Sequence, residues 1–157
     1  MINPELRNEV ETLYADYGAA LDDNELERWP DFFVEDCIYK VVPRENWERN
    51  LPVALMLCES RGMLRDRVTA VRNTAVYAPR SLRHFIGQIR VKEDGSGLLR
   101  VSANYMVLQT MVDELTRIQN AGKYLDLIVR TEGGLRFKEK ICVFDSVLVP
   151  NSLIYPV

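Results

Sequence analysis

Residues 98–131 decide the fold that this sequence predicts, because they hold two long strand-like segments, "LLRVSANYMVLQTMV" (98–112) and "LTRIQNAGKYLDLIVRT" (115–131). Both are rich in β-branched and aromatic residues. Similar segments flank them, "HFIGQIRV" (84–91) and "LRFKEKICVFDSVLV" (135–149), and the turn signals "EDGSG", "VDE" and "EGG" separate the four. We therefore expect four antiparallel strands in a strongly bent sheet, with Gly122 as a candidate bulge.

The segments before this sheet carry helical patterns. Asn3 followed by Pro4 predicts a helix start, and apolar residues continue at helical spacing to about Leu21. Ser60 likewise precedes an arginine-rich helical segment, "RGMLRDRVTAVRN" (61–73). Helices followed by strands indicate an α+β fold in which one face of the sheet packs on the helices.

Length and composition predict one domain over residues 1–157, since 47% of the residues are hydrophobic and 27% are charged. The first residues lack the basic and apolar pattern of a secretory signal, and no apolar run reaches the roughly 18 residues of a membrane span. A net charge of −3 gives no reason to expect a nucleic acid as partner. We expect a soluble, cytoplasmic protein with neither a membrane nor a nucleic-acid partner.

The inventory of metal and redox ligands excludes several chemistries. A non-haem iron triad needs two histidines, and a Rieske cluster needs two histidines and two cysteines, whereas His84 is the single histidine here. Cys37, Cys58 and Cys142 lie far apart in apolar contexts and are expected to be buried, reduced thiols. No P-loop or GxGxxG pattern supports nucleotide binding.

Acid–base chemistry remains open. His84 in the hollow of a curved sheet, with a carboxylate such as Asp36 or Asp126 and with Tyr14, would suit an isomerase, dehydratase or cyclase. A module that only binds a small molecule in the same hollow is a further alternative. The other interpretation is structural, with His84 and its neighbouring arginines pairing with acids of this chain or of another subunit. Residue counts favour this structural or interface interpretation.

Three stretches resemble a known family: "WPDFFVEDCIYKVVPRENWERNLPVALMLCESRGMLRDRV" (29–68), "RSLRHFIG" (80–87) and "CVFDSVLVPNSLIYPV" (142–157). They are similar to the small (beta) subunit of aromatic-ring-hydroxylating Rieske non-haem iron oxygenases. Within that family, they look most like the small subunits of salicylate hydroxylase and of anthranilate or terephthalate dioxygenase type enzymes. The likeness covers nearly the whole chain.

The resemblance implies a nuclear transport factor 2-like (cystatin-like) cone, and a structural subunit without a catalytic centre, metal or cofactor of its own. Its partner would be a large (alpha) subunit in an α3β3 complex, with the small subunits also associating as a trimer. The large subunit would hold the Rieske [2Fe-2S] cluster and a mononuclear Fe(II). Electrons would come from NAD(P)H through a reductase, with or without a ferredoxin. The complex would oxygenate a benzoate-like aromatic acid in aromatic compound catabolism.

For the residues, the resemblance implies that Arg80, Arg83 and His84 of "RSLRH" support the structure or a partner interface. Arg65 and Arg67 of the arginine-rich helix are candidates for the same role. Charge is also uneven along the chain, since residues 1–36 hold eleven acids against two arginines and residues 61–90 hold seven arginines against one acid. These segments either meet between neighbouring subunits of a ring or pair within one subunit.

Overall fold

The first helix begins where the sequence predicts it. The Asn3 side chain accepts a hydrogen bond from the Glu5 backbone N–H at 3.0 Å and caps α1 (Pro4–Asp22). The computed structural model describes residues 2–148 and 153–157. Within them the remaining elements are η1, a 3-10 helix (Leu26–Phe32), β1 (Phe33–Pro43), α2 (Arg44–Glu48), β2 (Met56–Cys58), α3 (Arg61–Asn73), β3 (Arg80–Glu93), β4 (Leu99–Met111), β5 (Arg117–Thr131) and β6 (Gly134–Phe144).

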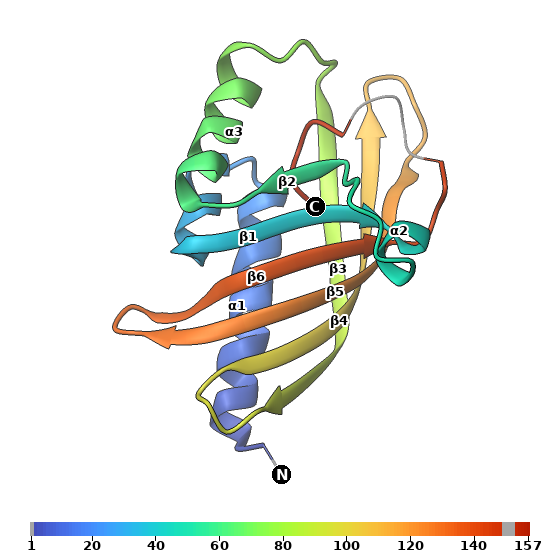
Figure 1. Ribbon diagram of the computed structural model, residues 1–157. Helices are drawn as coiled ribbons and strands as arrows, with labels where there is room; N and C mark the ends of the chain where they lie inside the picture. Colours follow the sequence, from blue (N-terminus) through green and yellow to red (C-terminus); the bar gives the residue numbers. More distant parts are fainter. Residues whose placement is uncertain (1, 149–152) are drawn as a thin grey trace.

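One curved sheet organises these elements, with the strand order β2-β1-β6-β5-β4-β3 (Figure 1). The four predicted strands form an antiparallel meander from β3 to β6, and the sheet bends around α1, which lies across one of its faces. This confirms the α+β fold with a strongly curved sheet. The expectation of purely antiparallel pairing is wrong at one place, because β1 runs parallel to β6. The long connection through α3 and the meander makes that parallel pairing sterically feasible.

Several boundaries differ from the sequence prediction. Strand β3 begins at Arg80, four residues before the predicted start, and β6 ends at Phe144 rather than near residue 149, which lies outside the described residues. The short helix α2 was not predicted. Directly after β6, Asp145 forms an ion pair with Arg44 at the start of α2.

Gly122 is required for close packing, and the predicted bulge at this position is wrong. Its pairing with both neighbouring strands stays in register, and the extra residue of β5 is Gln119, three positions earlier. A Cβ atom at Gly122 would lie 2.0 Å from the Val143 carbonyl oxygen of β6. Only glycine therefore lets the two strands approach each other at this bend.

The acidic N-terminal segment and the arginine-rich helix α3 meet within one molecule. Arg61 contacts Asp31 at 2.5 Å and Glu35 at 3.2 Å, and Arg72 contacts Glu27 at 2.7 Å. Ser60 caps α3 by accepting a hydrogen bond from the Met63 N–H at 3.2 Å, as its sequence predicts. For these charges, pairing within one subunit is the alternative that the structure supports.

Substituting Gly122 by alanine should destabilise the fold by about 3 kcal/mol or more, because the new methyl group overlaps the β6 backbone. The matched control is Gly87→Ala, since a Cβ there meets nothing within 4 Å. Urea unfolding of the wild type and the two variants measures the difference in their free energies of unfolding. Equal midpoints for Gly122→Ala and Gly87→Ala would contradict the close approach.

The Glu27 carboxyl should titrate far below its ordinary value. The Arg72 guanidinium holds the pKa of Glu27 at about 2, compared with 4.5 for an unperturbed carboxyl. Because the folded-state pKa is lowered, this contact stabilises the fold above the unfolded value and is lost as pH falls toward 2. Carboxyl NMR titration should show the pKa returning toward 4.5 in Arg72→Met. An unchanged Glu27 titration in that variant would exclude the Arg72 contact as the cause of the lowered pKa.

Candidate functional site

Aromatic side chains fill the interior of the cone. Eight of them have exposed fractions below 2%: Tyr14, Tyr17, Trp29, Phe33, Tyr39, Tyr124, Phe137 and Phe144. They pack mainly edge to face, as Tyr17 does against Phe137 with ring centroids 5.5 Å apart. The interior is therefore a packed core at the level of these rings.

A buried ion pair lies among the rings. Lys140 Nζ is 3.0 Å from Asp126 Oδ2, and both side chains are fully inaccessible to solvent. The Tyr14 hydroxyl donates to the same carboxylate oxygen. The Lys140 ammonium also lies 3.4 Å from the centroid of the Tyr124 ring and 4.6 Å from that of Tyr17, within cation–π distance.

The electrostatics of this cluster keep the Tyr14 hydroxyl protonated. Burial raises the pKa of Asp126, and the Lys140 ammonium and the Tyr14 hydroxyl oppose that rise. Burial, followed by the charge of Asp126, raises the pKa of Tyr14 well above its ordinary value. Tyr14 therefore donates a hydrogen bond and stays protonated at neutral pH.

The segment 153–157 closes the other side of the interior. The Val157 carbonyl oxygen accepts hydrogen bonds from the hydroxyls of Tyr17 at 2.7 Å and Tyr39 at 3.2 Å, and the Val157 N–H donates to Tyr39 at 2.9 Å. Arg67 of α3 donates to the Leu153 carbonyl at 2.9 Å. This segment is the described part of the tail "PNSLIYPV", because residues 150–152 lie outside the described residues.

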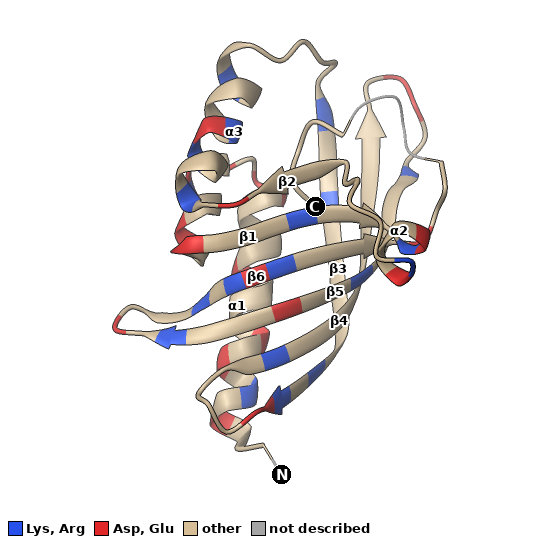
Figure 2. Ribbon diagram, in the orientation of Figure 1, with Lys and Arg blue, Asp and Glu red and all other residues tan. Residues whose placement is uncertain are grey.

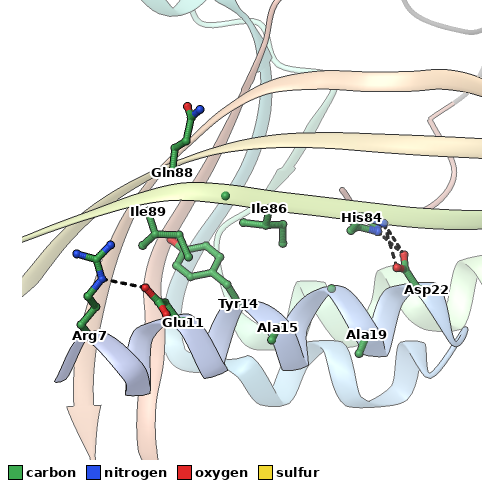
Figure 3. Close-up of a pocket in the computed structure, with 12 residues that line it drawn as sticks. Arg7, Glu11, Tyr14, Ala15, Ala19, Asp22, His84, Ile86, Gln88 and Ile89 are labelled. Atoms are coloured by element: carbon green, nitrogen blue, oxygen red, sulfur yellow. Dashed lines mark hydrogen bonds and ion pairs between the residues drawn. The ribbon is translucent and has the colours of Figure 1, made fainter. Parts of the chain in front are cut away.

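His84 lines a separate cleft of about 560 Å³ between α1 and β3 (Figure 3). Its Nδ1 lies 2.6 Å from Asp22 Oδ1, and its backbone N–H donates to the same carboxylate at 2.9 Å. Because a carboxylate only accepts, the proton lies on Nδ1. Asp22 thereby ties the C-terminal end of α1 to β3, the edge strand of the sheet, and occupies a backbone donor that another strand could use.

The groups proposed as acid–base partners of His84 contact other residues. Tyr14 lines the same cleft, but its hydroxyl is bound to Asp126 in the core. Asp36 is exposed and pairs with Lys138 at 2.9 Å. The partner that His84 does have, Asp22, was not predicted. This arrangement does not favour the isomerase, dehydratase or cyclase alternative.

The arginines with a predicted structural or interface role have different surroundings. Three of them contact their own chain: Arg65 with Glu35 at 3.6 Å, Arg67 with the Leu153 carbonyl at 2.9 Å, and Arg80 with Gln109 Oε1 at 3.0 Å. Arg83 is exposed on the outer face of β3 and has no ion pair among the described residues. Arg83 is thus the member of this set with a guanidinium that is free to meet another molecule.

The cysteines match the expectation of buried thiols, since all three are free and buried. Burial raises the pKa of the Cys142 thiol to about 12 and that of Cys37 to about 11, so both are protonated at neutral pH. Among residues 2–148 and 153–157, no group of three or more His, Cys, Asp or Glu side chains is placed to hold a metal ion. No helix in the same ranges is both long and apolar enough to cross a membrane.

Replacing Lys140 by methionine should destabilise the protein by about 3 to 5 kcal/mol, because Asp126 would remain buried without its counter-ion. Replacing both residues, as Lys140→Met with Asp126→Leu, should recover much of that loss. Lys138→Met is the matched control, because Lys138 forms an exposed pair expected to contribute about 1 kcal/mol or less. Denaturant unfolding measures the free energy of unfolding of the two single variants and the double variant against the wild type. A Lys140→Met protein as stable as Lys138→Met would refute the role of the buried pair.

Comparison with known proteins identifies the family of this fold. Residues 18–151 match the family described as "Ring hydroxylating beta subunit". The small subunit of anthranilate 1,2-dioxygenase from Burkholderia cepacia is 38% identical, over 95% of this chain and 92% of that protein.

Solved structures agree with this match. A beta subunit attributed to an aromatic-ring-hydroxylating dioxygenase of Novosphingobium aromaticivorans DSM 12444 is 39% identical, with a TM-score of 0.85 and 94% of each chain covered. A protein of the same organism attributed to the scytalone dehydratases has a TM-score of 0.70 at 19% identity, over 95% of this chain and 88% of that chain, and this likeness concerns the fold alone. The cone fold expected from the sequence is thereby confirmed, and the chain belongs to the ring-hydroxylating beta subunit family.

Proposed function

We propose that this chain is a structural subunit that holds the large, iron-containing subunits of an aromatic-ring-hydroxylating oxygenase in their active assembly. Membership of the beta subunit family carries this proposal. The filled interior supports it, since Asp126 and Tyr14 are engaged with Lys140 and lie apart from His84. The contribution of this chain to the reaction then passes through its surfaces.

The partner proposed is the large (alpha) subunit, in an α3β3 complex with the small subunits also in mutual contact. One histidine cannot supply the two that a Rieske cluster needs, nor the two of a mononuclear iron site, so the proposal assigns both iron centres to the large subunit. Electrons would reach them from NAD(P)H through a reductase, with or without a ferredoxin. No step of the reaction is assigned to residues of this chain.

For the substrate we propose a benzoate-like aromatic acid. The relative at 38% identity is named for anthranilate 1,2-dioxygenase, and anthranilate is such an acid. We further propose that the whole chain is one cytoplasmic domain. In it, His84, Arg65, Arg67 and Arg80 stabilise the fold through the contacts described above, and Arg83 faces a partner.

Co-expression with the large subunit tests the assembly role. Omitting this chain should lower the amount of soluble, active large subunit several-fold, because a subunit that loses an obligate interface is destabilised. A His84→Gln variant should restore soluble complex with turnover per iron within about twofold of the wild type, because His84 takes no part in the chemistry. Full assembly and turnover of the large subunit alone would contradict the proposal, and so would soluble but inactive complex with His84→Gln.

A further inference from the structure

The outer face of the sheet faces away from α1 (Figure 1). A groove of about 450 Å³ lies there over β3 to β6. Its basic side is formed by Arg90, Lys92 and Arg100 at the ends of β3 and β4. Its apolar side is formed by Leu125 and Leu127 of β5, together with Trp47 of α2. We call this surface the outer groove.

The basic side of the outer groove lacks compensation within the molecule. Lys92 lies directly opposite Arg100 in the antiparallel pair of β3 and β4, an arrangement of like charges that disfavours the sheet. Neither Arg90 nor Lys92 has an ion pair among the described residues, and the Asp94 contact of Arg100 is long, at 3.6 Å. Two acids line the outer groove, Glu139 and Asp126, but the Asp126 side chain is fully buried and pairs with Lys140, so positive charge remains in excess at the surface. An acidic group from outside would relieve the repulsion.

The apolar side of the outer groove indicates that the molecule that brings the acidic group also brings hydrophobic side chains. Trp47 is 42% exposed although it projects beside half-buried leucines. Exposed tryptophan next to aliphatic residues and arginine is typical of the centre of a protein interface. The occupant that fits is a short segment that combines carboxylates with large apolar side chains.

This chain has such a segment in the turn between β4 and β5, "VDEL" at residues 112–115, which we call the acidic turn. Val112 and Leu115 are 71% and 87% exposed, and they flank Asp113 and Glu114. Asp113 has no ion pair among the described residues, and Glu114 lies 3.7 Å from Arg117, a long and exposed contact. The acidic turn therefore presents the two kinds of side chain that the outer groove lacks.

The acidic turn cannot reach the outer groove of its own molecule. Ser102, in the outer groove, and Val112 are ten positions apart along β4 and its end, and extended chain of that length spans about 33 Å. Figure 2 shows the two at opposite ends of the sheet, with acidic residues at the turn between β4 and β5 and basic residues at the far ends of β3 and β4. A contact between two different patches joins copies head to tail, and this arrangement closes into a ring when the rotation permits.

We propose that the acidic turn of one copy docks into the outer groove of the next copy. Asp113 and Glu114 then lie against Arg90, Lys92 and Arg100, and Val112 and Leu115 contact Trp47 and the leucines of β5. This contact would join neighbouring small subunits within the complex, so its role there rests on the proposed assembly function. It differs from a contact between the acidic N-terminal segment of one copy and α3 of the next, because Arg61 and Arg72 of α3 bind acids of that segment within one molecule.

Charge reversal in the full-length chain tests the contact. Sedimentation velocity over a range of concentrations should show that the wild type forms species larger than a monomer and that added salt weakens them. Glu114→Lys and Lys92→Glu should each raise the dissociation constant about tenfold, as a screened attraction becomes a repulsion. The double variant in one chain should return to within about threefold of the wild type, because each reversed turn meets a reversed groove. Glu132→Lys, in the exposed turn between β5 and β6, is the matched control and should change nothing.

Three outcomes would overturn the proposal: a monomeric wild type at every concentration, single variants that associate like the wild type, or a double variant without recovery. A fourth is that the single variants lose binding to the large subunit while self-association persists, since the acidic turn or the outer groove would then serve a different partner. Co-expression with the large subunit distinguishes a failure of the head-to-tail contact from a failure of the assembly role. If the wild-type chain supports the large subunit and the reversals have no effect, the head-to-tail contact is wrong and the assembly role stands. If the wild-type chain does not support it, the assembly role is wrong.

Discussion

The fold depends on one buried charge, the ammonium of Lys140. An unpaired ammonium in an interior of aromatic rings would be unfavourable by several kcal/mol, so β6 is compatible with this core only when Asp126 lies beside it. Asp126 and Lys140 are direct cross-strand neighbours, and a one-residue slip of β5 would carry Asp126 to the outer face. The same carboxylate accepts the Tyr14 hydroxyl, which ties α1 to the two central strands. One carboxylate thus links strand register and helix position.

This requirement also limits what the cone does. The hollow of a curved sheet is a common place for a reaction chamber, and its walls here carry tyrosines, an acid and a base. Four of these groups, however, are held by another protein group: Tyr14 and Lys140 by Asp126, and Tyr17 and Tyr39 by the Val157 carbonyl oxygen. The Tyr124 hydroxyl has no hydrogen-bond partner among the described residues, but its ring lies over the Lys140 ammonium. The interior is organised for stability, whereas the outer groove and the acidic turn lie on the surface. A protein built in this way acts through the molecules that it holds together.

Local signals in the sequence predicted much of this architecture, and long-range contacts account for what they missed. Asn3 and Ser60 cap the helices expected of them, because capping involves residues only a few positions apart. The inward position of Lys140 was not predicted, since a register shift in β6 next to Lys138 changes which residues face the core after Phe137. The sequence pattern marked Gly122 as a bulge, whereas glycine is needed there because the backbone of β6 passes close to it. Asp22 gave a weak signal, an acid in the last turn of a helix where a carboxylate opposes the helix dipole.

Charge was the feature for which the linear sequence was least informative, because its total over a segment does not reveal which charges remain unpaired. The acids of the N-terminal segment and the arginines of α3 form the largest contrast in the sequence, yet Arg61 and Arg72 bind acids of the same molecule. Lys92 and Arg100 are separated by a turn and attract no notice in the sequence, but the ladder between β3 and β4 places them opposite each other. A sheet fixes such neighbours whether or not they attract, and a subunit whose function is assembly has reason to keep a repulsion that a second molecule relieves. The charges that matter for association are those that folding leaves uncompensated.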